Sequence, residues 1–269
     1  MSFILIALAL CAATLYALRG GLTGRGRFVT IAGFDMQSLG LGLFAIAVAA
    51  YWFGPMFGAA IILAVMIHEF GHVAAYRVCG HSDARFRLIP LMGGVAISNQ
   101  HPASQEKDFF ITLLGPAICI APMVLAYTLA DFMNSEGSGY LVYDYPSVTY
   151  FLQTFAFIMG AINFFNLLPF WPLDGGRIVA IICNTYAPQH VRNVTLAMTG
   201  LAIAIAVTMQ AWFLLAFLVF SLSAVQQAIM LNQVQRRMGP QRGLWAVAAY
   251  LVTTATFAFV GWPLIMRFF

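Results

Sequence analysis

The sequence predicts an all-α polytopic membrane protein, and two observations support this fold class. Of the 269 residues, 62% are hydrophobic and 8% are charged, whereas charged residues make up about 25% of a typical soluble domain. The apolar residues also form runs of roughly 15 to 25, close to the length that a helix needs to cross a bilayer. We count about eight such runs, with a range of six to eight, and expect one integral membrane domain over residues 1–269.

The first apolar run covers residues 1–18. No basic segment precedes it and no small-residue cleavage site follows it, so we interpret it as a retained helix and not as a signal peptide. Residues 1–30 are therefore predicted to hold an extra N-terminal helix. A short extended element over residues 28–36 and a second span over residues 39–53 follow, and Gly54-Pro55 indicates a turn.

The third run, residues 59–79, contains His68, Glu69 and His72. Residues four apart lie on one helix face, where both imidazoles can reach one metal ion. Glu69 is then placed to deprotonate a metal-bound water, as in the H-E-x-x-H pattern of zinc hydrolases. A chance match is the alternative. However, ionisable groups inside a span cost roughly 2.5 kcal/mol or more each, and zinc would turn both imidazoles into satisfied ligands.

Residues 80–107 form the longest polar stretch of the chain. Within it, residues 90–97 are apolar and include a glycine pair, Gly93 and Gly94. This pattern predicts a β-hairpin or a re-entrant segment, because irregular backbone at membrane depth must line a protein or water cavity. An exposed strand edge over residues 92–97 would allow an extended peptide to pair with it. The alternative is an interfacial loop with a flexible glycine pair.

The fourth run, residues 109–130, is interrupted by Gly115-Pro116 and by Pro122, which predicts a kinked helix. The fifth run, residues 148–168, leads into the prolines of the segment 169–177, so we predict a broken helix that resumes to about Tyr186. Three further spans are expected, and residues 187–269 are interpreted as accessory helices; these spans are residues 194–208, 211–234 and 244–268.

A catalytic zinc usually has three protein ligands and a water, so the two histidines need a partner. Asp174 is the best candidate, because the prolines before it free backbone groups and Gly175-Gly176 after it permit close approach. The alternative is an ordinary Asp-Gly turn. Asn163 and Asn166 lie on one face of the fifth span, where they could orient a ligand or hold a carbonyl oxygen.

The distribution of basic residues bears on partners and orientation. The net charge is +4, but the thirteen basic residues are scattered at span ends, which indicates topology signals and not nucleic-acid binding. Alternating the spans places nearly all arginines on the cytoplasmic side and His68 nearer that face. The four cysteines form no C-x-x-C pair, which gives no sign of a disulfide framework.

The two motifs together resemble the site-2 protease family of intramembrane zinc metalloproteases. The family joins an HExxH helix, here residues 68–72, to a downstream N-x-x-P-x-x-x-L-D-G element, here residues 166–175. The resemblance covers residues 31–186, which we take as the catalytic core. It implies zinc ligation by His68, His72 and Asp174, with Glu69 as catalytic base. It also implies that Asn166 and the Gly93-Gly94 segment contact substrate.

Two departures from the family pattern stand out. Its G-P-x-x-N pattern ends here in Cys119, and no stretch is long and polar enough for a PDZ or CBS domain. The implied reaction is hydrolysis of a peptide bond in or near a transmembrane segment of another protein, within the lipid bilayer. The short chain without targeting signals favours a bacterial inner membrane. The alternative function is a transporter or metal-ion carrier that uses the same three ligands. The sequence gives no oligomeric state.

Overall fold

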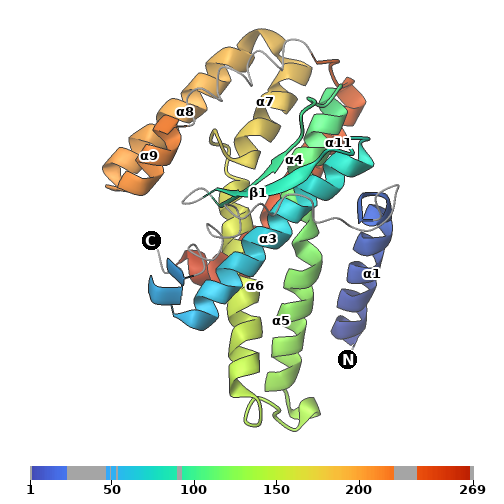
Figure 1. The fold of residues 1–269 in the computed structure, drawn as a ribbon, viewed down its shortest axis with the longest axis vertical. Helices are drawn as coiled ribbons and strands as arrows, with labels where there is room; N and C mark the ends of the chain where they lie inside the picture. The colour runs from blue at the N-terminus through green and yellow to red at the C-terminus, as the bar shows by residue number, and fades with distance from the viewer. Residues whose placement is uncertain are drawn as a thin grey trace. The chain divides into compact units, whose positions relative to one another are not determined.

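The computed structural model describes residues 2–22, 47–48, 50–52, 54–89, 93–220 and 235–266. The predicted extended element at residues 28–36, most of the second span and residues 221–234 lie outside this part of the chain. Figure 1 shows the elements in chain order, which are α1 (Ser2–Leu22), α3 (Pro55–Val78), β1 (Arg85–Ile89), β2 (Gly93–Ile97), α4 (Gln105–Ile118), α5 (Ile120–Asn134), α6 (Pro146–Asn166), α7 (Asp174–Tyr186), α8 (Val191–Thr208), α9 (Trp212–Phe220) and α11 (Pro240–Ile265).

The described residues include six helical stretches that are long and apolar enough to cross a membrane. This count lies at the lower end of the predicted range and confirms an all-α polytopic membrane protein. Two of the stretches are composite, because one joins α4 to α5 and another begins in the short 3-10 turn before α8. The six stretches are Phe3–Gly21, Pro55–Val78, Gln105–Asn134, Pro146–Asn166, Pro188–Thr208 and Pro240–Ile265.

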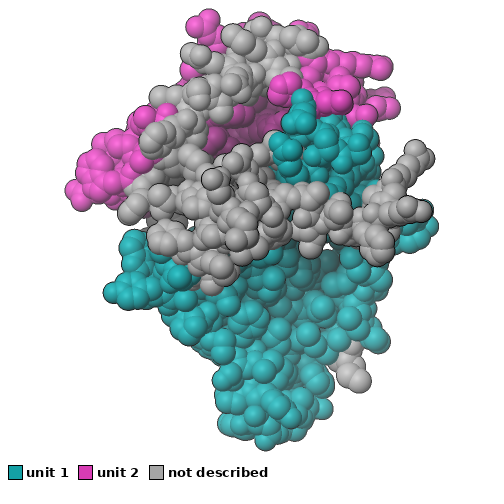
Figure 2. Space-filling view, in the orientation of Figure 1, with its two compact units in different colours: residues 1–99, 114–164, 255–269 teal, residues 100–113, 165–254 magenta. Residues whose placement is uncertain are grey.

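The chain divides into two compact units, shown in different colours in Figure 2. The first unit comprises residues 1–99, 114–164 and 255–269, and the second comprises residues 100–113 and 165–254. In the first unit, α1 packs against both α3 and α5. In the second unit, α7 packs against α8, which in turn packs against α9.

Helix α3 has clear start and stop signals. It follows Gly54, whose φ of 82° suits glycine, and Pro55 occupies its first turn, where the missing N–H costs nothing. At the other end, Gly80 adopts a φ of 100°, and its N–H bonds to the Arg77 carbonyl while the His81 N–H reaches the Tyr76 carbonyl. This pair of bonds is a Schellman motif, which satisfies the last carbonyls of the helix.

Strands β1 and β2 form an antiparallel hairpin, with Arg85 opposite Ile97 and Ile89 opposite Gly93. The prediction of a hairpin at the glycine pair is therefore confirmed. The strand that holds the glycine pair, β2, is paired with the arginine-containing segment just before it, β1. Both strands pack against α3. The hairpin thus lies in the same unit as the helix that carries His68 and His72.

A polar cluster closes the base of this hairpin. The Ser98 hydroxyl lies 3.1 Å from His81 Nδ1 and donates to the Asp83 carboxylate, which also accepts the Asn99 backbone N–H at 2.6 Å. His81 is buried and its ring meets the Tyr76 ring edge-on. On the sequence alone, the loop position of His81 beside arginines favours a solvated side chain. This expectation is wrong, because the helix C-terminus turns the side chain inward.

The break in the fourth span lies at Cys119, between the two predicted interruptions at Gly115-Pro116 and Pro122. Helix α4 runs through Gly115 and Pro116 and ends at Ile118, and α5 begins at Ile120. The Cys119 N–H bonds to the Pro116 carbonyl at 2.9 Å, which tightens the last turn. Pro116 has no N–H to donate to the helix, yet the interruption between α4 and α5 falls at Cys119, where the tightened turn ends.

A buried polar network crosses the second unit near the start of α4. Asp108 is 2% exposed and pairs with Arg177 at 2.5 Å. The Gln235 side chain donates to Asp108 and to the Pro102 carbonyl, and the Met238 N–H donates to Gln105. This network links α4 and the segment 235–238 to α7. It reaches α7 at Arg177, three residues beyond Asp174.

We predict that Asp108→Leu lowers the free energy of unfolding by about 2 to 3 kcal/mol. Removing one member of a buried ion pair leaves the other charge uncompensated, which costs about 3 to 5 kcal/mol when both are fully buried, and the Arg177 side chain is 31% exposed. Unfolding in mixed SDS micelles measures this loss. Glu106→Gln is the control, because its pair with Arg242 is exposed and exposed pairs contribute about 1 kcal/mol or less. Equal losses in the two variants would contradict the network's role.

We also predict that the base of the hairpin loosens in acid. The bond from the Asn99 N–H, followed by that from Ser98, holds the pKa of Asp83 below its ordinary value of 3.8. A lowered pKa means stabilisation that is fully present above the ordinary value and is lost as pH falls through the lowered one. Hydrogen exchange of residues 93–99, corrected for intrinsic rates, should show protection falling below about pH 4. Asp83→Asn should remove this pH dependence.

Candidate metal centre

His68 and His72 form a close pair on one face of α3. Their Nε2 atoms lie 3.1 Å apart and their ring centroids 4.9 Å apart. The side chains are 3% and 9% exposed, respectively. Two ligands of one tetrahedral zinc, each about 2.0 Å from it, are separated by about 3.3 Å. The spacing of the two nitrogens therefore fits a shared metal ion.

His68 has a second buried partner on α6. Its Nδ1 lies 2.7 Å from the Oδ1 of Asn163, and the Asn163 amide nitrogen donates to the Met159 carbonyl at 2.8 Å. The sequence predicted that Asn163 or Asn166 could orient a ligand or hold a carbonyl oxygen, but it did not show which histidine Asn163 contacts. No spacing rule connects it to the HExxH helix, because the contact joins residues 95 positions apart.

Two glycines allow α3 and α4 to approach closely enough to hold His72. A Cβ at Gly71 would lie 2.4 Å from the Leu114 carbonyl oxygen, and a Cβ at Gly115 would lie 2.2 Å from the His72 ring. The His72 imidazole therefore packs directly on the backbone of α4. Any side chain at either position would separate the helices or displace the ring.

Asp174 begins α7, just after the tight turn that breaks the fifth span. Gly175 and Gly176 pack against the backbone of this turn, with ideal Cβ positions 2.2 Å from the Leu167 carbonyl and 2.5 Å from the Phe170 carbonyl. The Tyr250 hydroxyl donates to the same Leu167 carbonyl at 2.6 Å. The carboxylate at a helix N-terminus is favoured by the helix dipole, so the turn and the dipole both fix Asp174.

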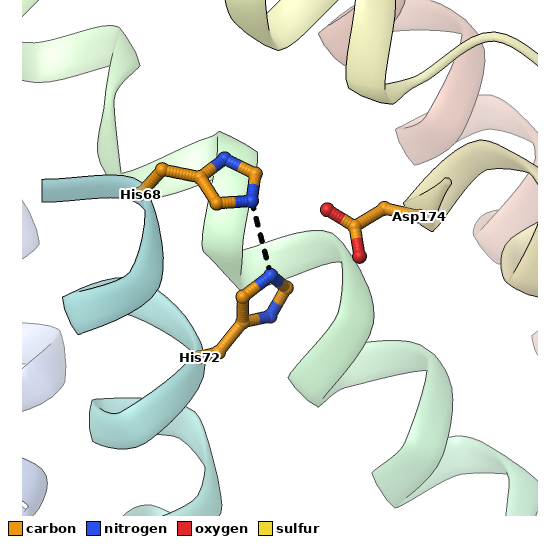
Figure 3. Close-up of side chains that lie close together, drawn as sticks. All are labelled: His68, His72 and Asp174. Atoms are coloured by element: carbon orange, nitrogen blue, oxygen red, sulfur yellow. Dashed lines mark hydrogen bonds between the residues drawn. The ribbon is translucent and has the colours of Figure 1, made fainter. Parts of the chain in front are cut away.

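Among the described residues, His68, His72 and Asp174 form the group able to hold a metal ion, with ligand atoms within 4.8 Å of one another (Figure 3). Two imidazoles and one carboxylate are a ligand set that zinc hydrolases use, with the fourth position left for water. The donor set therefore fits zinc.

The other predicted site residues are placed as follows. Glu69 follows His68 on α3 and is partly buried. Asn166 is the last residue of α6 and is partly buried. Gly93 and Gly94 begin β2, opposite Ile89 and Leu88.

Comparison with known proteins supports the resemblance. The family model described as Peptidase family M50 matches residues 144–209, which span α6, the turn before Asp174, α7 and α8. The matched region contains the N-x-x-P-x-x-x-L-D-G element at residues 166–175. The chain is therefore similar to peptidase family M50, in agreement with the resemblance to the site-2 proteases.

Three curated relatives illustrate the similarity. Stage IV sporulation protein FB of Bacillus subtilis is 27% identical over 172 residues, covering 60% of this chain and 56% of that protein. Zinc metalloprotease MJ0392 of Methanocaldococcus jannaschii is 28% identical over 127 residues, covering 47% and 34%. Putative zinc metalloprotease Rip3 of Mycobacterium tuberculosis is 33% identical over 130 residues, covering 48% and 31%. The chain thus spans about half of the first relative and about a third of the others.

A solved structure, the site-2 protease from Methanocaldococcus jannaschii, is also similar to this chain. It is 20% identical, with a TM-score of 0.45, and the match covers 72% of this chain and 88% of that one.

We predict that Gly115→Ala weakens zinc binding by about tenfold or more, because the added methyl group displaces the His72 ring. Zinc affinity is measured on the purified protein by competition with a chromogenic chelator. Gly200→Ala is the control, since nothing lies within 4 Å of a Cβ at that position in α8. If Gly115→Ala bound zinc as tightly as Gly200→Ala, His72 would not be a ligand held by this helix crossing.

Proposed function

We propose that this chain is an intramembrane zinc metalloprotease, which hydrolyses a peptide bond in or near a transmembrane segment of another protein. One observation carries the proposal. Two imidazoles lie beside Glu69 on an apolar helix, and they are grouped with the carboxylate of Asp174. In the proposed site His68, His72 and Asp174 bind zinc. Three polar ligands within an apolar helical environment are costly unless they serve such a purpose.

Bound zinc supplies a Lewis acid that polarises the scissile carbonyl and lowers the pKa of water toward about 7. The chain's own residues do the rest. Glu69 accepts a proton from the attacking water as the C–O bond forms, and it passes that proton to the amine nitrogen as the C–N bond breaks. Asn163 holds the His68 ring in place, and the buried walls of the site limit the access of other water.

The substrate is proposed to bind as an extended strand. A helical peptide hides its amides, so a transmembrane substrate must unwind locally before it is cut. Strand addition to the hairpin would hold it extended, and β1 and β2 pair only with each other among the described strands. Gly93 and Gly94 would present bare backbone to the peptide, and Asn166 at the end of α6 would orient its carbonyl group.

The chain is an integral multi-pass membrane protein, and we propose that its location is a bacterial inner membrane. The arginine distribution supports an active site nearer the cytoplasmic face. Water would enter from that side, near the hairpin segment. The partner of the enzyme is then a membrane protein with a transmembrane segment that can reach the hairpin within the bilayer.

Glu69→Gln is expected to retain zinc while losing at least about a thousandfold in cleavage rate, since general base catalysis and proton delivery both disappear. Cleavage is followed on a co-expressed library of single-pass membrane segments, and zinc is counted by atomic absorption. His72→Ala is the companion variant and should lose both zinc and cleavage. Unchanged cleavage in Glu69→Gln would refute the base assignment. Rapid metal flux through the wild-type protein in vesicles would instead support a transporter.

A further inference from the structure

The Asn163 side chain is fixed in one orientation by its own helix. It is fully buried, and its Nδ2 donates to the Met159 carbonyl one turn earlier on α6. A carbonyl oxygen accepts hydrogen bonds and does not donate them, so the amide nitrogen must face Met159. The amide oxygen therefore faces His68, at 2.7 Å from Nδ1.

This orientation determines which nitrogen of His68 carries a proton. The amide oxygen is an acceptor, so Nδ1 must be the protonated donor. The lone pair of the neutral ring then lies on Nε2, the atom that faces His72 at 3.1 Å. A ligand histidine whose other nitrogen donates to a fixed acceptor is held in both tautomer and ring orientation.

The residue at position 119 does not supply this acceptor. Cys119 is fully buried where the resemblance leads one to expect asparagine, and its thiol donates to the Gly115 carbonyl at 3.7 Å. It also interacts with the Asn163 side chain. A thiol is a weak hydrogen-bonding group, so the amide at this wall of the site comes from α6.

We propose that Asn163 is a positioning residue for the zinc site, which sets the His68 tautomer and thereby the affinity for zinc. The proposal rests on the proposed function, since it assumes that His68 binds zinc. The proposal gives α6 a role in zinc binding by the HExxH helix, and Asn163 belongs to neither of the two sequence motifs. Cys119 fills the space beside Asn163 without taking part in this role.

Zinc affinity of the purified full-length protein, measured by chelator competition, tests the proposal. Asn163→Leu should weaken binding by about 10- to 100-fold, the range found when such orienting partners are lost. Asn163→Asp keeps an oxygen acceptor for Nδ1 and should stay within about threefold of the wild type. This rescue separates tautomer control from simple packing, since both substitutions alter the helix-internal bond to Met159.

Asn134→Leu is the matched control, because Asn134 makes the same bond to the carbonyl four residues earlier at 2.8 Å but contacts no histidine. Its zinc affinity should equal that of the wild type, as should that of Cys119→Ala. Equal affinity in Asn163→Leu and wild type would overturn the inference and leave the proposed function standing. Loss in Cys119→Ala as large as in Asn163→Leu would also overturn it. A wild-type protein that binds no zinc would refute the proposed function itself.

Discussion

The close approach of α3 and α4 at Gly71 and Gly115 is the constraint on which the metal centre depends. Both glycines leave no room for a Cβ, and the His72 ring lies directly on the backbone at Gly115. The crossing therefore orients one imidazole by contact, while Asn163 orients the other by a hydrogen bond. Two different interactions thus fix the two candidate ligands on neighbouring turns of one helix. Each of them uses a different neighbouring helix.

Asp174 is fixed in another way. Its helix starts directly from a turn whose carbonyls pack on Gly175 and Gly176, and its position at the helix N-terminus suits a carboxylate. The ion pair between Asp108 and Arg177 lies one turn further along α7. The glycine packing, the helix dipole and the ion pair therefore all act on the first two turns of α7. The residues of α7 that fix Asp174 thus lie within the short segment 174–177.

The sequence predicted the parts of the structure that follow local rules. Apolar runs of bilayer length locate the helices, and a spacing of four places His68 and His72 on one face. The hairpin at Gly93-Gly94 was also predicted. The contact from Asn163 to His68 was not, because it depends on how α3 and α6 pack. The burial of His81 was likewise missed, since the Schellman turn at Gly80 decides which way that side chain points.

The bond from Tyr250 to the Leu167 carbonyl gives the last long helix a part in the shape of the site. Gly175 also packs against that carbonyl, so α11 supports the turn that precedes Asp174. A fragment cut after α8 would retain every residue of both motifs and still lack this support. The residues that support the Asp174 turn therefore extend beyond the stretch that carries the two motifs.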